Sequence, residues 1–89
     1  MKAVITVLGS DKVGIIAKVS TLLADRGINI LDITQTIMQN MFTMIMLVDL
    51  SESSSKVGEI AQELDKCGQS LGVSITIAHE GIYKSMHKI

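Results

Sequence analysis

The stretch from residue 2 to residue 27, KAVITVLGSDKVGIIAKVSTLLADRG, predicts a strand, a loop and a helix in succession. Residues 2–8 are rich in β-branched side chains and stop at a glycine, which is typical of a strand. Between Lys12 and Asp25, apolar side chains recur at helical spacing, and Gly27 follows where a left-handed C-cap is expected. The apolar stripe of this helix consists of Ile16, Val19, Leu22 and Leu23. Either Ser10 or Asp11 is its expected N-cap.

The rest of the chain adds three more strands and one more helix. Residues 28–39 and 42–50 are strand-like runs separated by Asn40 and Met41, a spacing that favours a hairpin, and Asn40 tolerates a positive φ. A serine-rich loop at 51–55 precedes a second helix, which Gly68 or Gly72 ends. The apolar face of that helix consists of Val57, Ile60, Ala61, Leu64 and Leu71. Residues 73–80 alternate as a half-buried strand does, and residues 81–89 form a polar tail.

The resulting order is βαββαβ in one domain spanning residues 1–89. Right-handed crossovers place both helices on the same side of the sheet, which predicts an α+β, ferredoxin-like plait with four antiparallel strands. Both faces of two strands are apolar: the third carries Phe42, Met44, Met46 and Val48 on one face and Ile45 and Leu47 on the other, and the first carries Val4 and Leu8 opposite Ala3, Ile5 and Val7, so the face without helices also needs cover. A chain of 9.6 kDa buries a marginal fraction of its surface. We therefore expect a homodimer or higher homo-oligomer.

Composition excludes several classes of protein. The net charge is −1 with scattered basic residues, and the aromatic residues are Phe42 and Tyr83, so a nucleic-acid or anionic-lipid surface is not expected. Apolar runs are too short to span a membrane. A lone Cys67 builds neither a disulfide framework nor a metal cage, and no signal peptide opens the chain, so we expect a cytoplasmic protein.

The residues that could carry chemistry are few. Residues 9–14, GSDKVG, match half of a P-loop but lack the Lys-Ser/Thr pair that follows it, and Asp11 would repel phosphate. His79 and His87 have no clustered ligands beside them, and no nucleophile–base pair is visible, so we expect no metal, no cofactor and no enzyme. Four methionines at 38, 41, 44 and 46 are interpreted as core or interface filler rather than a copper site.

Two runs resemble the signature of ACT domains, the small-molecule-sensing modules of amino-acid metabolism: GSDKVGIIAKVS at 9–20 and LADRGINILD at 23–32. The resemblance covers essentially the whole chain. It is strongest to the ACT domains of formyltetrahydrofolate hydrolases and of the glycine-cleavage regulator, in which Asp-Lys/Arg-x-Gly-Ile and Asn-Ile-x-Asp recur. Val13 stands where many ACT loops carry proline.

The resemblance implies a stand-alone, non-catalytic regulatory module. It implies a side-by-side dimer with an eight-stranded sheet that binds an amino acid in the seam and signals through a protein partner. The implied ligand-binding residues are Asp11, Lys12, Val13, Gly14 and Ile15 of one chain with Asn29 of its partner. The alternative is a pure dimerisation or protein-interaction module without a ligand. For Asn29 and Asp32, ligand contact and protection of an edge strand both remain open.

Overall fold

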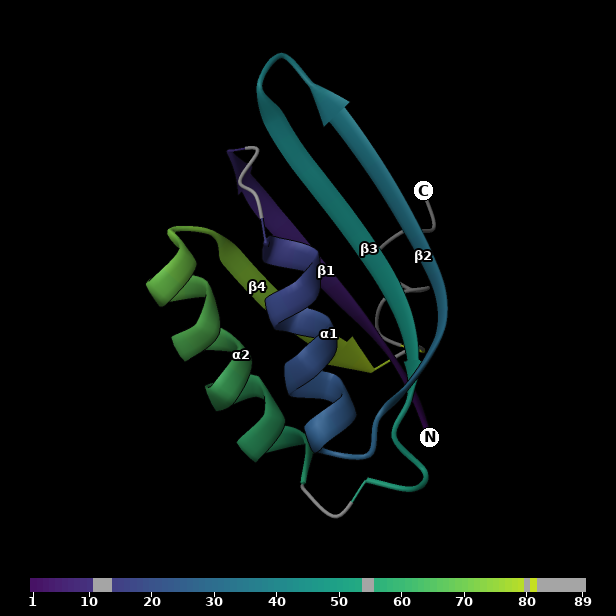
Figure 1. Ribbon diagram of the computed structural model, residues 1–89. Coiled ribbons are helices and arrows are strands. Elements are labelled where there is room, and N and C mark those ends of the chain that lie inside the picture. The colour runs from purple at the N-terminus through teal and green to yellow at the C-terminus, as the bar shows by residue number, and fades with distance from the viewer. Residues whose placement is uncertain (11–13, 54–55, 80, 82–89) are drawn as a thin grey trace.

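The computed structural model describes residues 1–10, 14–53, 56–79 and 81, and it confirms the ferredoxin-like plait (Figure 1). The elements are β1 (Lys2–Ser10), α1 (Ile15–Asp25), β2 (Asn29–Met38), β3 (Met41–Asp49), α2 (Val57–Leu71) and β4 (Ser74–His79). The sheet has the strand order β2-β3-β1-β4, and every neighbouring pair is antiparallel. Both helices cover one face of this sheet. Apart from Gly81, the predicted tail at 81–89 lies outside the described residues.

The first helix starts later than the sequence predicts. Strand β1 continues to Ser10, which pairs with Met41, so Ser10 cannot cap a helix. The N-cap is Gly14, with φ 90° and ψ −3°, and within the described part of the chain no side chain caps the helix there. The prediction of Ser10 or Asp11 as N-cap is therefore wrong. The chain enters α1 through a left-handed residue, a conformation that glycine adopts without steric cost.

The other element ends agree with turn chemistry. Gln39 and Asn40 have φ values of 48° and 71° and connect β2 to β3, so the hairpin turn lies one residue earlier than predicted, while the positive φ of Asn40 is confirmed. Gly27, just after α1, has φ 71°, as expected of a left-handed residue after a helix. Helix α2 ends at Gly72, with φ 72°, and Gly68 is a buried helical residue.

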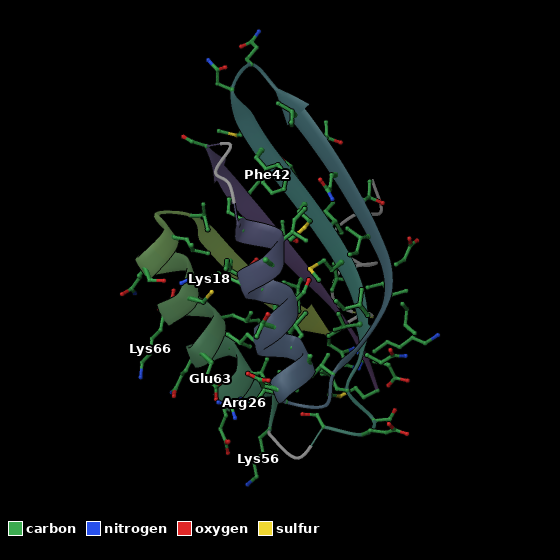
Figure 2. The ribbon with its side chains drawn as sticks, in the orientation of Figure 1. Lys18, Arg26, Phe42, Lys56, Glu63 and Lys66 are labelled. Carbon is green, nitrogen blue, oxygen red and sulfur yellow. The ribbon has the colours of Figure 1, made fainter. Side chains whose placement is uncertain are left out.

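The core lies between the helices and the sheet. From the helices it receives Ile15, Val19, Leu23, Ile60 and Leu64, and from β1 and β3 it receives Ala3, Ile5, Val7, Phe42, Met44, Met46 and Val48. The sequence placed Ile16 in this stripe, but Ile15 takes the place and Ile16 is 38% exposed. Lys18 lies on the flank of α1 that faces α2 (Figure 2). Ile16 is about 200° around the helix from Lys18, so it lies on the flank toward β2.

Alternation along the strands gives the open face of the sheet an apolar strip, as predicted. Val4 points away from the helices and is nevertheless only 6% exposed, and Ile45 and Leu47 are half-buried. Leu8, on the same face, is exposed. The expectation that a second copy covers this face stays a prediction.

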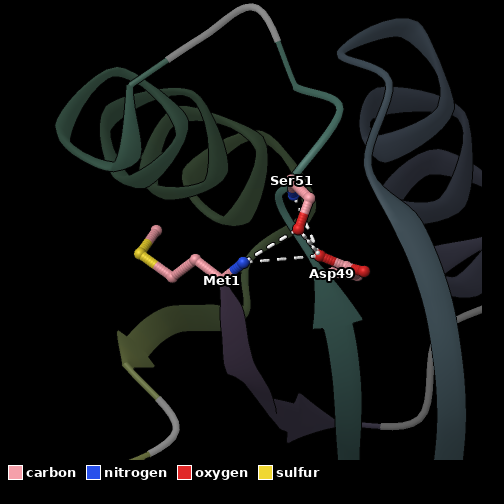
Figure 3. A network of polar contacts seen from close by, with 3 residues as sticks. All are labelled: Met1, Asp49 and Ser51. Carbon is pink, nitrogen blue, oxygen red and sulfur yellow. Dashed lines mark hydrogen bonds and ion pairs between the residues drawn. The ribbon is translucent and has the colours of Figure 1, made fainter.

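Two polar contacts connect elements that are distant in sequence. Arg26, at the end of α1, donates through Nε to Oε2 of Glu63 on α2 at 2.6 Å, and both side chains are partly exposed (Figure 2). The terminal ammonium of Met1 donates to Ser51 Oγ at 2.9 Å and lies 3.7 Å from Asp49 Oδ1 (Figure 3). These contacts join the two helices and fix the start of β1 beside the end of β3.

Candidate ligand site

The start of α1 offers unpaired backbone donors. The first intrahelical bond runs from the N–H of Lys18 to the carbonyl of Gly14 at 3.0 Å, so the N–H groups of Ile15, Ile16 and Ala17 precede the regular ladder. Among the described residues, no side chain accepts from them as a cap. The positive end of the helix dipole lies at the same place. This helix start can therefore accept a carboxylate from a ligand.

Gly14 leaves room beside these donors. A Cβ built on Gly14 would meet no atom within 4 Å, so crowding by the described residues does not explain why glycine stands here. The φ of 90° at Gly14 explains why glycine stands here, because residues with a Cβ rarely adopt that conformation. Among the described residues, no atom lies within 4 Å of the Cβ position of Gly14 to block an approach to the helix start.

The remaining residues of the predicted loop contribute differently. Ile15 is 2% exposed and its side chain belongs to the core, so only its backbone N–H faces the candidate site. Asp11, Lys12 and Val13 lie outside the described residues. Among the described residues, the part of the site that the loop contributes therefore consists of backbone N–H groups next to Gly14.

Asn29 is exposed at the beginning of β2, at the other end of the sheet. It pairs with Asp49, which in turn pairs with Lys2 at the start of β1, whereas Gly14 follows the end of β1. Nine strand residues separate these two ends, a distance of about 30 Å. One chain therefore does not bring Gly14 and Asn29 together.

Asp32 has a local role. Its carboxylate Oδ1 accepts the backbone N–H of Ile33 at 2.9 Å, beside a break in the β2–β3 register between Ile30 and Asp32. A bulge and a carboxylate at the start of an outer strand hinder further pairing there. Edge protection thus has a structural basis for Asp32, and ligand contact stays open for Asn29.

The other candidate residues do not form a chemical centre. Among the described residues, no three His, Cys, Asp or Glu side chains gather in a way that could hold a metal ion. His79 accepts the Gly81 N–H through Nδ1 at 3.0 Å, and Cys67 is half-buried against the core. Met44 and Met46 are fully buried, as expected for core filler. His87 lies outside the described residues.

One carboxylate titrates away from its ordinary value. The hydroxyl of Ser51 donates to Asp49 Oδ1 at 2.6 Å, and the backbone N–H of Ser51 donates to the same oxygen at 2.9 Å. These two donors, with a smaller contribution from the terminal ammonium, hold the pKa of Asp49 below 3.8. This network lies at the opposite end of the sheet from Gly14 and beside Asn29, the register partner of Asp49.

Sequence reasoning missed a row of exposed apolar side chains on β2. Leu31, Ile33 and Ile37 are 43%, 37% and 63% exposed, and Ile16 on α1 lies on the flank toward them. The available signal was the run ITQTIM at 33–38, which has no charged residue although it belongs to an outer strand. The apolar surface that the sequence predicts is therefore present, and it lies on the outer edge of β2 as well as on the open face of the sheet.

A family model described as the ACT domain matches residues 2–78. The chain belongs to the ACT-domain family. It is 61% identical over 89 residues to a UPF0237 protein of Clostridium acetobutylicum, with all of both chains covered. It also superimposes on an ACT domain protein from Streptococcus pneumoniae with a TM-score of 0.82, 42% identity and 93% of each chain covered.

Two other solved structures have the fold that the sequence resemblance implied. A glycine cleavage system transcriptional repressor, described as putative, has a TM-score of 0.72 at 28% identity, with 86% of this ACT domain and 44% of that chain covered. A formyltetrahydrofolate deformylase from Burkholderia mallei has a TM-score of 0.77 at 15% identity, with 88% and 28% covered, and this likeness concerns the fold alone. In the described residues, no helix is long and apolar enough to cross a membrane.

Proposed function

We propose that this ACT domain is a non-catalytic regulatory module that binds a small ligand, an amino acid, between two copies of the chain and signals through a protein partner in the cytoplasm. The observation that carries the proposal is Gly14: a left-handed residue directly before helix N–H groups that no side chain of the described residues caps, with no described atom within 4 Å of its Cβ position. Such a start accepts a carboxylate without a charged side chain.

The ligand's other groups require other residues. The N–H groups from Ile15 onward receive the carboxylate, a carboxylate at Asp11 pairs with the ammonium, and the amide of Asn29 serves either group. Asn29 lies at the far end of the same sheet, so a second copy must supply it. The proposal thus ties ligand binding to self-association, as the resemblance to ACT domains implies.

The regulatory part of the proposal is supported by membership of the family. ACT domains are generally regulatory and ligand-binding, and one structural neighbour is a putative transcriptional repressor of the glycine cleavage system. That repressor is more than twice as long as the matched region. We infer that the output of this domain passes through contact with a regulated protein.

A second candidate function is a dimerisation module without a ligand. The exposed apolar row on β2 favours it, because such a surface promotes association whether or not the site at Gly14 is occupied. The two candidates differ in one observable: only the regulatory module is stabilised by a free small molecule.

Thermal unfolding with a panel of free amino acids tests the proposal. A ligand at tenfold its Kd stabilises the folded state by about 1.4 kcal/mol. In a domain of this size that raises Tm by about 6 to 11 °C. If no amino acid in the panel shifts Tm, the dimerisation module is the better description.

A matched pair of variants locates the site. Gly14→Ala and Gly72→Ala both place a Cβ on a glycine with positive φ, so both lose about 1 kcal/mol or more of stability through backbone strain. We expect only Gly14→Ala to lose the ligand-induced shift, because its methyl group occupies the approach to the helix start. Asn29→Ala should reduce the shift with little change in the unliganded Tm. A normal shift in Gly14→Ala would place the ligand elsewhere.

A further inference from the structure

Burial on the open face of the sheet differs between its two ends. Near the β2–β3 hairpin, Leu8 is 42% exposed and its β4 partner Ser74 is exposed. Near the start of β1, Val4 is 6% exposed and its partners Leu47 and Ala78 are half-buried. Both positions on β1 have a neighbour on β3 and one on β4, so pairing within the sheet does not account for the difference. The end of the open face around Val4 is therefore the end that needs a cover.

The chain leaves the sheet at this same end. His79, the last residue of β4, pairs with Ala3, which precedes Val4. The opposite face of the sheet is occupied by the two helices, and α2 packs against β4 there (Figure 1). Residues 80–89 consequently follow β4 at a point where the open face is the free side of the sheet.

The described contact after β4 is typical of a helix start. The backbone N–H of Gly81 donates to His79 Nδ1 at 3.0 Å, and the backbone of Gly81 is helical. A side-chain acceptor that receives the N–H two residues further along is the usual contact of an N-cap residue. With His79 as N-cap, Glu80 stands at the first helical position, where a negative charge is favourable.

The sequence of residues 80–89, EGIYKSMHKI, is amphipathic at helical spacing. At 3.6 residues per turn its apolar side chains fall within an arc of about 120°, and its other side chains from residue 84 onward fall outside that arc. The apolar side chains are Ile82, Tyr83, Met86 and Ile89. A helix of this pattern needs one apolar surface to lie on.

We propose that residues 80–89 form an amphipathic helix that crosses the open face of the sheet from β4 toward β2 and covers Val4 and Leu47. Ten helical residues extend about 15 Å, and the four strands together span about 14 Å, so the length fits. Met86 is about 9 Å along this helix and β3 is about 10 Å from β4, which brings Met86 over Leu47. Because burial is confined to one end of the strands, the helix crosses them rather than running along them.

The charges fit this direction. On the β2 side the covered surface ends at Asp32, which is exposed and in register with Leu47. Lys88, near the far end of the segment, comes closest to β2 in this arrangement and brings a positive charge toward that carboxylate. Lys84 lies on the polar side of the helix and stays in water.

The covering segment controls access to this face. While it is in place, neither a second copy nor a regulated protein can reach the apolar strip of Val4 and Leu47. A short terminal segment is among the parts of a fold that open most easily. Residues 80–89 thus act as an autoinhibitory strap, and their release exposes a surface for protein contact.

Tyr83 supplies a reporter for this segment, since it is the only tyrosine of the chain and there is no tryptophan. We expect acrylamide to quench Tyr83 emission much less in the native protein than in urea. Met86→Lys places an ammonium group on the apolar side of the helix, so it should raise quenching to the value in urea while the urea transition stays cooperative. Ser85→Lys adds the same charge on the polar side and is the matched control, which should leave quenching unchanged.

Labelling of single thiols shows what the segment covers. Cys67 is the only cysteine, so in a Cys67→Ser background Leu47→Cys and Leu8→Cys each carry one thiol on the open face. We expect Leu47→Cys to react with a disulfide reagent several-fold more slowly than Leu8→Cys. Adding Met86→Lys should remove the protection at position 47 and leave the rate at position 8 unchanged.

Three outcomes would overturn the proposal. Tyr83 could be as accessible to acrylamide in the native protein as in urea. Protection at position 47 could persist beside Met86→Lys, which would separate it from the segment. It could also rise with protein concentration, which would assign the cover to a second copy of the chain. None of these measurements uses an amino acid, so their result is independent of the proposed function.

Discussion

Replacing Gly9 by alanine tests how closely the end of β1 packs before the candidate site. A Cβ at Gly9 would lie 2.4 Å from Val73 Cγ1, 2.9 Å from Val73 Cβ and 3.3 Å from Val73 Cα. Gly9 is not among the glycines with positive φ, so backbone strain plays no part. The side-chain end of Val73 can rotate away, but its Cβ can move only with the backbone. The clash therefore acts on the connection between α2 and β4.

The expected cost follows from this geometry. Overpacking by one methyl group typically costs about 1 to 3 kcal/mol, and a neighbour that yields only through its backbone belongs in the upper half of that range. We expect Gly9→Ala to lose about 2 to 3 kcal/mol of unfolding free energy. In a domain of this size that lowers Tm by about 8 to 24 °C.

Urea and thermal unfolding of four variants give the measurement. Gly58→Ala is the matched control, because Gly58 is an exposed helical residue whose Cβ would meet nothing within 4 Å, and it should gain about 0.5 to 1 kcal/mol. Val73→Gly removes the two closest atoms, so adding Gly9→Ala in that background should cost less than about 1 kcal/mol. An unchanged or raised stability in Gly9→Ala, or a full penalty that persists beside Val73→Gly, would refute this reasoning.

Three further predictions concern the fold. Ser51→Ala removes both the hydroxyl donor to Asp49 and the acceptor of the terminal ammonium. Because the pKa of Asp49 is lowered in the folded state, the stabilisation by the hydroxyl is present above pH 3.8 and is lost as the pH falls through the folded pKa. The difference in Tm between wild type and Ser51→Ala should therefore narrow from pH 7 to pH 2. Arg26→Gln should lower Tm slightly at low salt, and the difference from wild type should shrink in about 1 M NaCl, since its contact with Glu63 is partly exposed. Met46→Ala should cost about 2 to 5 kcal/mol and Met46→Leu less than about 1.5 kcal/mol in urea unfolding, because Met46 is fully buried and leucine nearly conserves its volume.

The fold was predictable from the sequence because periodicity and turn residues agree along the chain. The different positions of Ile15 and Ile16 show the limit of prediction from periodicity. Both are apolar and both fit a stripe through Val19 and Leu23, so periodicity alone does not choose between them. The choice depends on the angle at which the chain enters α1, which the left-handed conformation of Gly14 sets.

The candidate site was predictable in part. The open loop and the glycine could be recognised from residue types and from the resemblance to ACT domains. The separation of Gly14 from Asn29 could not be recognised from residue types, because it follows from the strand register. Asn29 lies level with Lys2 at one end of the sheet, and Gly14 follows Ser10 at the other end. The exposure of Ile37 depends on β2 being an outer strand of the sheet; the uncharged run at 33–38 was the signal for an apolar strand, but its place at the edge follows from the strand order β2-β3-β1-β4.

The position of Asn29 at the far end of the sheet from Gly14 has a consequence for how such a module would respond in a cell. If a ligand needs groups from two chains, ligand binding and dimerisation are linked equilibria, and each raises the apparent affinity of the other. The apparent Kd for the ligand then depends on the concentration of the protein itself. A cell that doubles the amount of this chain lowers the ligand concentration at which the module responds, so expression level sets the threshold without any change in sequence.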